Sequence, residues 1–272
     1  TLKSSVFYYP TDYSTGFLIV GDFFRKYAYA VWYTVVISWK TDGFRKCKYS
    51  LFRTNFFRKD FSSMKAYERL LSYVKIFTPS NEESTSSPSS RCQFDLARLL
   101  VEELKGLGIS DVTLDDHCYV YAHLPATEGL EHCKALGFIA HMDTVSDFCD
   151  HAVTPVITEN YDGKELPLGT SGRTLSPEMF SHLTSLAGLT LITSDGTTIL
   201  GADDKAGIAE ILTALEHILT EKIPHGPLCV AFTPDEEIGM GPAHFNVKKF
   251  GADYAYTLDG DTEGEIQYEN FN

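Results

Sequence analysis

Acidic residues and one histidine follow short apolar runs at four places in the chain. These places are His141-Met142-Asp143, Asp203-Asp204-Lys205, Asp235-Glu236-Glu237 and Asp259. Side chains two residues apart in an extended segment point the same way, so His141 and Asp143 are predicted to share a face. A carboxylate in that position can orient the imidazole or act as a ligand beside it.

Adjacent carboxylates are costly to crowd together unless a cation neutralises them, and mixed imidazole and carboxylate ligands suit zinc, with manganese or cobalt as substitutes. In a pair such as Glu236-Glu237, one residue can bind a metal while its neighbour acts as a general base. Taken singly, the aspartate pair is typical of a helix cap and the glutamate pair of a solvated turn. Their occurrence together at four predicted strand ends favours a metal site.

The elements that would position these residues alternate between helix and strand from Met64 onward. Apolar spacing predicts helices over 65–77 and 93–106 and a long helix beginning at Asp203-Asp204, with a loop over 80–90. Strand-like runs are found at 111–114, 118–122, 136–140, 189–192, 199–202, 228–232 and 254–258. Residues 157–187 are expected to be turns and polar insertions near the site. This order predicts an α/β domain with its site past the strand ends.

The first 63 residues differ in kind from the rest. They carry a formal charge of +6, against −20 for 64–272, and hold 18 of the 35 aromatic residues. Because Met64 is the first methionine, we interpret 1–63 as a non-native or spurious leader. The alternative is a membrane anchor or export signal in the apolar stretch 17–39. Its longest uncharged run has 13 residues, whereas a spanning helix needs about 20.

Composition narrows the function further. The 272 residues are 43% hydrophobic and 22% charged, with a net charge of −14, which argues against partners such as nucleic acid or an anionic membrane. Small molecules or cations are the expected partners. The six cysteines include no C-x-x-C pair, and a chain of this size needs no disulfides, so a reducing, cytoplasmic setting is expected.

The motifs resemble those of the two-zinc exopeptidases, the family that also contains carboxypeptidases and aminoacylases. The segments that carry the resemblance are 141–144, 190–210, 230–237 and 256–260. Within that family, 64–272 is similar to the N-terminal half of enzymes that remove the first residue of tripeptides. The resemblance implies an α/β fold in which a mixed or mostly parallel sheet is flanked by helices.

The resemblance also implies a role for each polar residue. His141, Asp203 and Asp259 would hold one zinc ion, Asp203 would bridge to a second, and Glu237 would bind that second ion. Asp143 would orient His141, Glu236 would be the general base, and the Asp203-Asp204 peptide bond would be cis. Two zinc ions per complete site, a small peptide substrate and a homodimer of the full-length form belong to the same expectation.

Two departures from the family pattern are visible. After 141–144 the family continues with a small residue and proline, whereas this chain has Val145-Ser146. Family members also run past the counterpart of Asn272, adding a lid or dimerisation domain and a returning segment with one more histidine ligand. We therefore expect a C-terminally truncated catalytic domain over 64–272, itself with little activity.

Two other interpretations stay open at this point. One is an inactive truncated fragment that binds at most one metal. The other is a related dipeptidase or aminoacylase that uses the same metal ligands.

Overall fold

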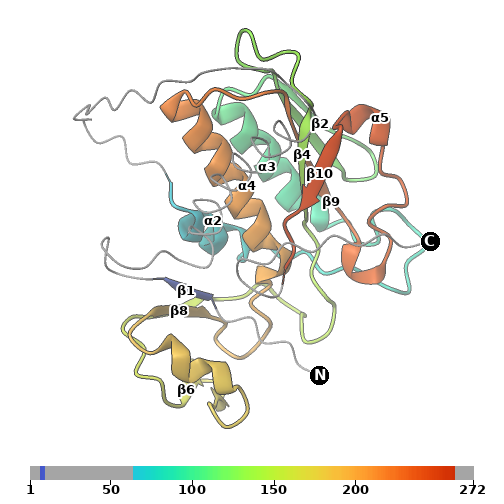
Figure 1. Ribbon diagram of the computed structural model, residues 1–272. Coiled ribbons are helices and arrows are strands. Elements are labelled where there is room, and N and C mark those ends of the chain that lie inside the picture. The colour runs from blue at the N-terminus through green and yellow to red at the C-terminus, as the bar shows by residue number, and fades with distance from the viewer. Residues whose placement is uncertain (1–6, 10–63, 261–272) are drawn as a thin grey trace, which may run out of the picture.

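The computed structural model describes residues 7–9 and 64–260, and its main sheet has five strands in the order β10-β4-β9-β3-β2. The strands are β2 (Asp111–Leu114), β3 (Val120–Leu124), β4 (Leu136–His141), β9 (Leu228–Thr233) and β10 (Tyr254–Thr257). Strands β10, β4 and β9 run parallel to one another, β3 pairs antiparallel with β9, and β2 pairs antiparallel with β3 (Figure 1). The sheet is mixed, so the predicted fold class is confirmed.

Helices α3 (Gln93–Gly106) and α4 (Ala202–Glu221) cover one face of this sheet, and α2 (Ala66–Tyr73) packs against α4 (Figure 1). Residues along β3 alternate between the faces: Val120 and Ala122 pack in the helix-side core, whereas Tyr121 packs with Phe250 on the other side. Phe250 is the last residue of the short helix α5 (Val247–Phe250). The central strand β9 is buried along its whole length.

Helix α4 approaches the end of β10 closely at Gly207. A Cβ atom added to Gly207 would lie 2.1 Å from the backbone oxygen of Leu258, so only glycine fits there. The first turn of α4, with Asp203, therefore lies next to the end of β10, where Asp259 follows.

Residues 156–193 form a smaller unit with a core of its own, which corrects the expectation of turns and polar insertions over 157–187. It contains β5 (Val156–Thr158), β6 (Leu166–Leu168), β7 (Arg173–Leu175), the 3₁₀ helix η1 (Ser181–Leu186) and β8 (Thr190–Thr193). Its buried side chains are Tyr161, Leu166, Leu168, Leu175, Leu183 and Leu191. The apolar residues lie far apart in a turn-rich sequence, so the local pattern does not show that they meet.

Strand β1 (Phe7–Tyr9) pairs antiparallel with β8. The rest of the predicted leader, 1–6 and 10–63, lies outside the described residues, and its interpretation as non-native stays a prediction. Within the described part of the chain, no helix combines the length and the apolar character needed to cross a membrane.

The predicted strand over 199–202 is wrong. Gly201 has a φ of 69°, and Thr198 and Ile199 both donate hydrogen bonds to the backbone oxygen of Phe148. These contacts hold the segment as a loop that leads directly into α4. Helix α2 is also shorter than predicted, because its last helical residue is Tyr73.

Candidate metal centre

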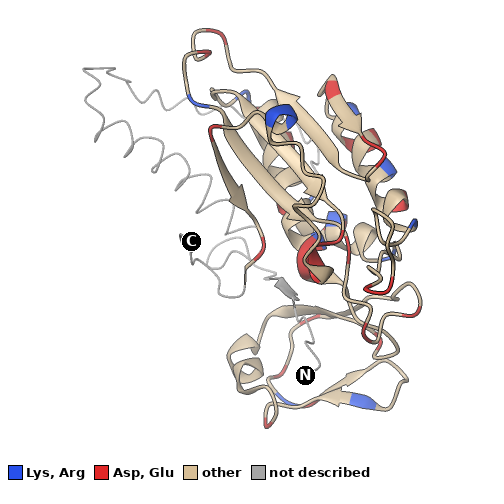
Figure 2. Ribbon diagram, turned by 90° about the vertical axis from the view of Figure 1, so that its right-hand side faces the viewer, with Lys and Arg blue, Asp and Glu red and all other residues tan. Residues whose placement is uncertain are grey.

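The acidic motifs meet at one end of the main sheet. Strand β4 ends at His141, the 3₁₀ helix η2 (Glu236–Ile238) follows β9, and Asp259 follows β10. Because these three strands are parallel, their carboxyl ends lie at the same end of the sheet, where Figure 2 shows acidic residues gathered. The predicted meeting of four strand ends is right for three of them. The fourth contributor, Asp203, lies in the first turn of α4 instead.

His141, Asp203 and Asp259 form a compact group whose ligand atoms all lie within 4.8 Å of one another. The Nε2 atom of His141 is 3.0 Å from Asp203 Oδ1 and 3.8 Å from Asp259 Oδ2. The imidazole is buried, whereas the carboxylates of Asp203 and Asp259 are partly exposed. The histidine is therefore the buried member of the group, and the two carboxylates face solvent.

The glutamate pair lies beside this group. Glu236 Oε2 is 3.7 Å from His141 Nε2, and half of the Glu236 side chain is exposed. Glu237 is not a member of the three-residue group. Burial, followed by the nearby charge of Asp203, raises the pKa of Glu237 to about 7.

Asp143 is fully buried behind the histidine and connects it to the glutamate pair. Its Oδ1 atom is 3.3 Å from His141 Nδ1, which also lies 3.0 Å from the Asp143 backbone oxygen. The two carboxylate oxygens accept the backbone N–H groups of Glu236 at 2.9 Å and Glu237 at 3.1 Å. The spacing of His141 and Asp143 predicted the first contact, but nothing local in the sequence indicated the other two.

The electrostatics of the group suit a cation. Burial lowers the pKa of His141, but hydrogen bonds to Asp143 and Asp203 outweigh it and raise that pKa to about 12. The pKa of Asp259 is raised by burial and by repulsion from Asp203 and Glu236, against an opposing effect of His141. One imidazole nitrogen and clustered carboxylate oxygens are a donor set that fits zinc.

Asp204 belongs to the support of the site, although sequence reasoning grouped it with the metal motifs. It is buried, and it accepts hydrogen bonds from the backbone N–H groups of His141 at 3.1 Å and Gly207 at 3.2 Å. Burial raises its pKa well above the usual range. The Asp203-Asp204 peptide bond is cis, as the resemblance implied.

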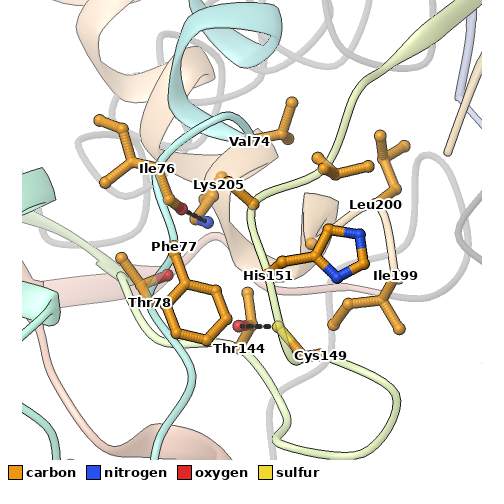
Figure 3. Close-up of a pocket in the computed structure, with 13 residues that line it drawn as sticks. Val74, Ile76, Phe77, Thr78, Thr144, Cys149, His151, Ile199, Leu200 and Lys205 are labelled. Atoms are coloured by element: carbon orange, nitrogen blue, oxygen red, sulfur yellow. Dashed lines mark hydrogen bonds between the residues drawn. The ribbon is translucent and has the colours of Figure 1, made fainter. Parts of the chain in front are cut away.

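A separate small pocket is lined in part by Thr144, Cys149 and Lys205 (Figure 3). The buried Lys205 ammonium donates to the backbone oxygen of Ile76 at 2.8 Å, and burial lowers its pKa to about 8. None of the candidate ligands lines this pocket, so the metal chemistry belongs to the open group around His141.

Comparison with known proteins agrees with these motifs. Residues 195–267 match the family described as Peptidase family M20/M25/M40. The chain is 53% identical over 208 residues to peptidase T from Alkaliphilus oremlandii and 52% identical over 209 residues to peptidase T from Clostridium perfringens. The matches cover 75% and 76% of this chain and 51% of each relative, so the chain spans about half the length of these relatives.

Solved structures show the same fold. The crystal structure of aminopeptidase PepT from Bacillus cereus matches with a TM-score of 0.52 and 25% identity, and a tripeptidase from Staphylococcus aureus with 0.51 and 27%. Each match covers 73% of this chain and 43% of the other. The resemblance to the zinc exopeptidases is thus confirmed, and it lies with the N-terminal part of peptidase T.

Proposed function

We propose that 64–272 is part of the catalytic domain of a metallo-aminopeptidase that removes the N-terminal residue from tripeptides. The observation that carries the proposal is the group of His141, Asp203 and Asp259 at the carboxyl edge of the sheet. The identity of more than 50% to peptidase T supports the reaction and the substrate class.

In this proposal His141, Asp203 and Asp259 hold one zinc ion, and Asp203 and Glu237 contribute to the site of a second. Bound zinc would polarise the peptide carbonyl and lower the pKa of a water molecule. Asp143 orients the imidazole: with Nδ1–H donating to Asp143, the Nε2 lone pair is free to bind a metal.

Glu236 is the proposed general base. Its carboxylate is near His141 Nε2 yet half exposed, so a water molecule and a peptide can both reach it. Glu236 accepts a proton from the attacking water, whose oxygen bonds to the carbonyl carbon. It then returns that proton to the amine as the carbon–nitrogen bond breaks.

The proposal also includes the substrates, the oligomeric state and the cellular compartment. Tripeptides are the substrates, the longer form of the protein is a homodimer, and the compartment is the cytoplasm. The five cysteines in the described part of the chain are all free thiols, which supports a reducing compartment.

One observation favours a second candidate, an inactive fragment that binds a single metal. The described residues bring three ligands together, and Glu237 is not among them. We therefore expect the 272-residue chain to hold about one zinc ion, because three protein ligands are a sufficient set for one zinc. We also expect little peptidase activity, because a second ion would be missing from the proposed two-zinc site.

Two measurements test the proposal. Elemental analysis of the purified chain gives zinc per chain, and a chimera that carries 64–272 in place of the matching part of Alkaliphilus oremlandii peptidase T gives activity. The chimera should cleave tripeptides in preference to dipeptides and N-acyl amino acids, and Asp203→Ala should remove both its zinc and its turnover. A chimera that hydrolysed only dipeptides or N-acyl amino acids would contradict the proposed substrate class.

A further inference from the structure

The turn that carries Glu236 and Glu237 has an unusual backbone. It begins at Asp235, whose φ is 56°, and ends at Gly239, whose φ is 71°. Glycine adopts a positive φ readily, whereas the Cβ atom of an aspartate makes the same conformation sterically less favourable, so contacts of its side chain help to hold it. The conformation of Asp235 sets the direction in which the next two residues leave β9, so whatever holds Asp235 also places the glutamates.

The side chain of Asp235 is buried and hydrogen-bonded to a segment far away in the sequence. It accepts from the Ser89 backbone N–H at 2.7 Å, from the Ser89 hydroxyl at 2.5 Å and from Gln93 Nε2 at 2.7 Å. The backbone N–H of Asp235 donates in return to Gln93 Oε1 at 3.3 Å. Ser89 and Gln93 are themselves buried, so solvent cannot replace a contact that is lost.

The same turn is held from its other side by Asp143, which accepts the backbone N–H groups of Glu236 and Glu237. Asp143 contacts His141 as well, and thus belongs to the metal centre. Ser89 and Gln93 instead reach the turn through their hydrogen bonds to Asp235.

We propose that Gln93 and Ser89 are positioning residues of the active site: they lock Asp235 in its left-handed conformation and so hold the carboxylates of Glu236 and Glu237 at the edge where His141 lies. The catalytic meaning of this lock rests on the proposed function. The lock itself is a structural property that can be measured without activity.

Backbone hydrogen exchange over 235–240 in the full chain tests the lock. In Gln93→Met the amide that bonds Asp235 is replaced by an apolar side chain of similar length. Because a hydrogen bond to a buried charged group is lost, exchange in this turn should accelerate by about 10-fold or more.

Thr213→Val is the matched control. Thr213 Oγ1 accepts from Arg69 and donates to the backbone oxygen of Ala209, so its loss also removes buried hydrogen bonds, on α4. It should lower overall stability without a selective change over 235–240. Acceleration in the turn that is equal in Gln93→Met and Thr213→Val would overturn the proposal, as would an unchanged rate in Gln93→Met.

A double variant in which the carboxylate and the amide exchange positions should restore slow hydrogen exchange in the turn. A general loss of stability would not be reversed in this way. In Gln93→Glu with Asp235→Asn, the asparagine amide can donate to the new carboxylate, which can also accept the backbone N–H of residue 235. Asparagine tolerates a positive φ. Exchange over 235–240 should return to within about 3-fold of wild type, whereas Gln93→Glu alone should not recover, because two buried carboxylates then face each other.

Cobalt titration of the wild-type chain, followed by visible absorption, separates this proposal from the proposed function. Absence of cobalt binding would contradict the metal centre and would not alter the exchange result. Normal cobalt binding together with an unaltered turn in Gln93→Met would overturn the lock and leave the metal centre standing.

Discussion

Replacing Asp143 by asparagine tests how far the metal centre depends on a buried carboxylate that is not itself a proposed ligand. Its oxygens accept the backbone N–H groups of Glu236 and Glu237 at 2.9 and 3.1 Å, and Oδ1 lies 3.3 Å from His141 Nδ1. Asparagine has nearly the same shape, but one of its oxygens is replaced by an amino group that can only donate. At least one of the three donors therefore loses its acceptor where water cannot enter.

The expected losses of stability and of zinc affinity in Asp143→Asn follow from these contacts. Loss of one hydrogen bond to a buried charged acceptor should lower the free energy of unfolding of the metal-free chain by about 1.5–3 kcal/mol. Loss of the group that orients an imidazole ligand typically weakens metal binding by about 10–100-fold, or about 1.4–2.7 kcal/mol. Because zinc binds the folded state, the stabilisation by zinc should shrink by the second amount.

Urea unfolding with a chelator and with zinc, combined with a chelator-competition measurement of zinc affinity, gives both quantities. Asp115→Asn is the matched control, because Asp115 Oδ1 also accepts two backbone N–H groups, those of His117 at 3.0 Å and Tyr119 at 2.9 Å. It lies between β2 and β3 and should change stability alone. An Asp143→Asn chain with the zinc affinity of wild type would refute the orienting role.

Three further outcomes are expected. In the chimera, Glu236→Gln should lower turnover by about 10²–10⁴-fold at unchanged zinc content, and a variant that kept most of its turnover in a tripeptide assay would contradict the base assignment. The pKa of Glu237 is raised to about 7, above its usual value of about 4.3. This carboxyl therefore stabilises the metal-free fold at low pH and loses that contribution as the pH rises through 7. The free energy of unfolding, measured with urea between about pH 5 and 8, should fall more steeply with pH for wild type than for Glu237→Gln. A chain that begins at Met64 should be at least as soluble as the full chain and unfold cooperatively, whereas loss of its cooperative transition would show that 1–63 is structural.

Elements with strong periodicity were predicted well. The helix over 93–106 matches α3, and the strand at 111–114 matches β2, because apolar spacing within one element is a local property. The 199–202 segment was missed because its conformation depends on hydrogen bonds to Phe148, about 50 residues away. Apolar composition alone could not separate a buried loop from a strand.

The candidate site also has a part that local sequence predicts and a part that depends on distant contacts. His141, Asp203 and Asp259 could be predicted to meet because each follows an apolar run or begins a helix, and the parallel strands bring those ends together. The two functions of Asp143, at His141 and at the backbone of the glutamate pair, could only be half predicted. The contacts of Asp235 with Ser89 and Gln93 span more than 140 residues, and no motif marks them.

Among the strands that the structure describes, β10 lies at the edge of the main sheet, pairs with β4, and has three of its four residues exposed. Edge strands of this kind open more readily than central ones. A cation shared by Asp259, His141 and Asp203 would fasten this strand to β4 and α4, and its removal would leave 254–257 open to proteolytic attack while the rest of the sheet stays folded. The supply of metal would then govern the lifetime of the folded chain among cellular proteases as well as its chemistry.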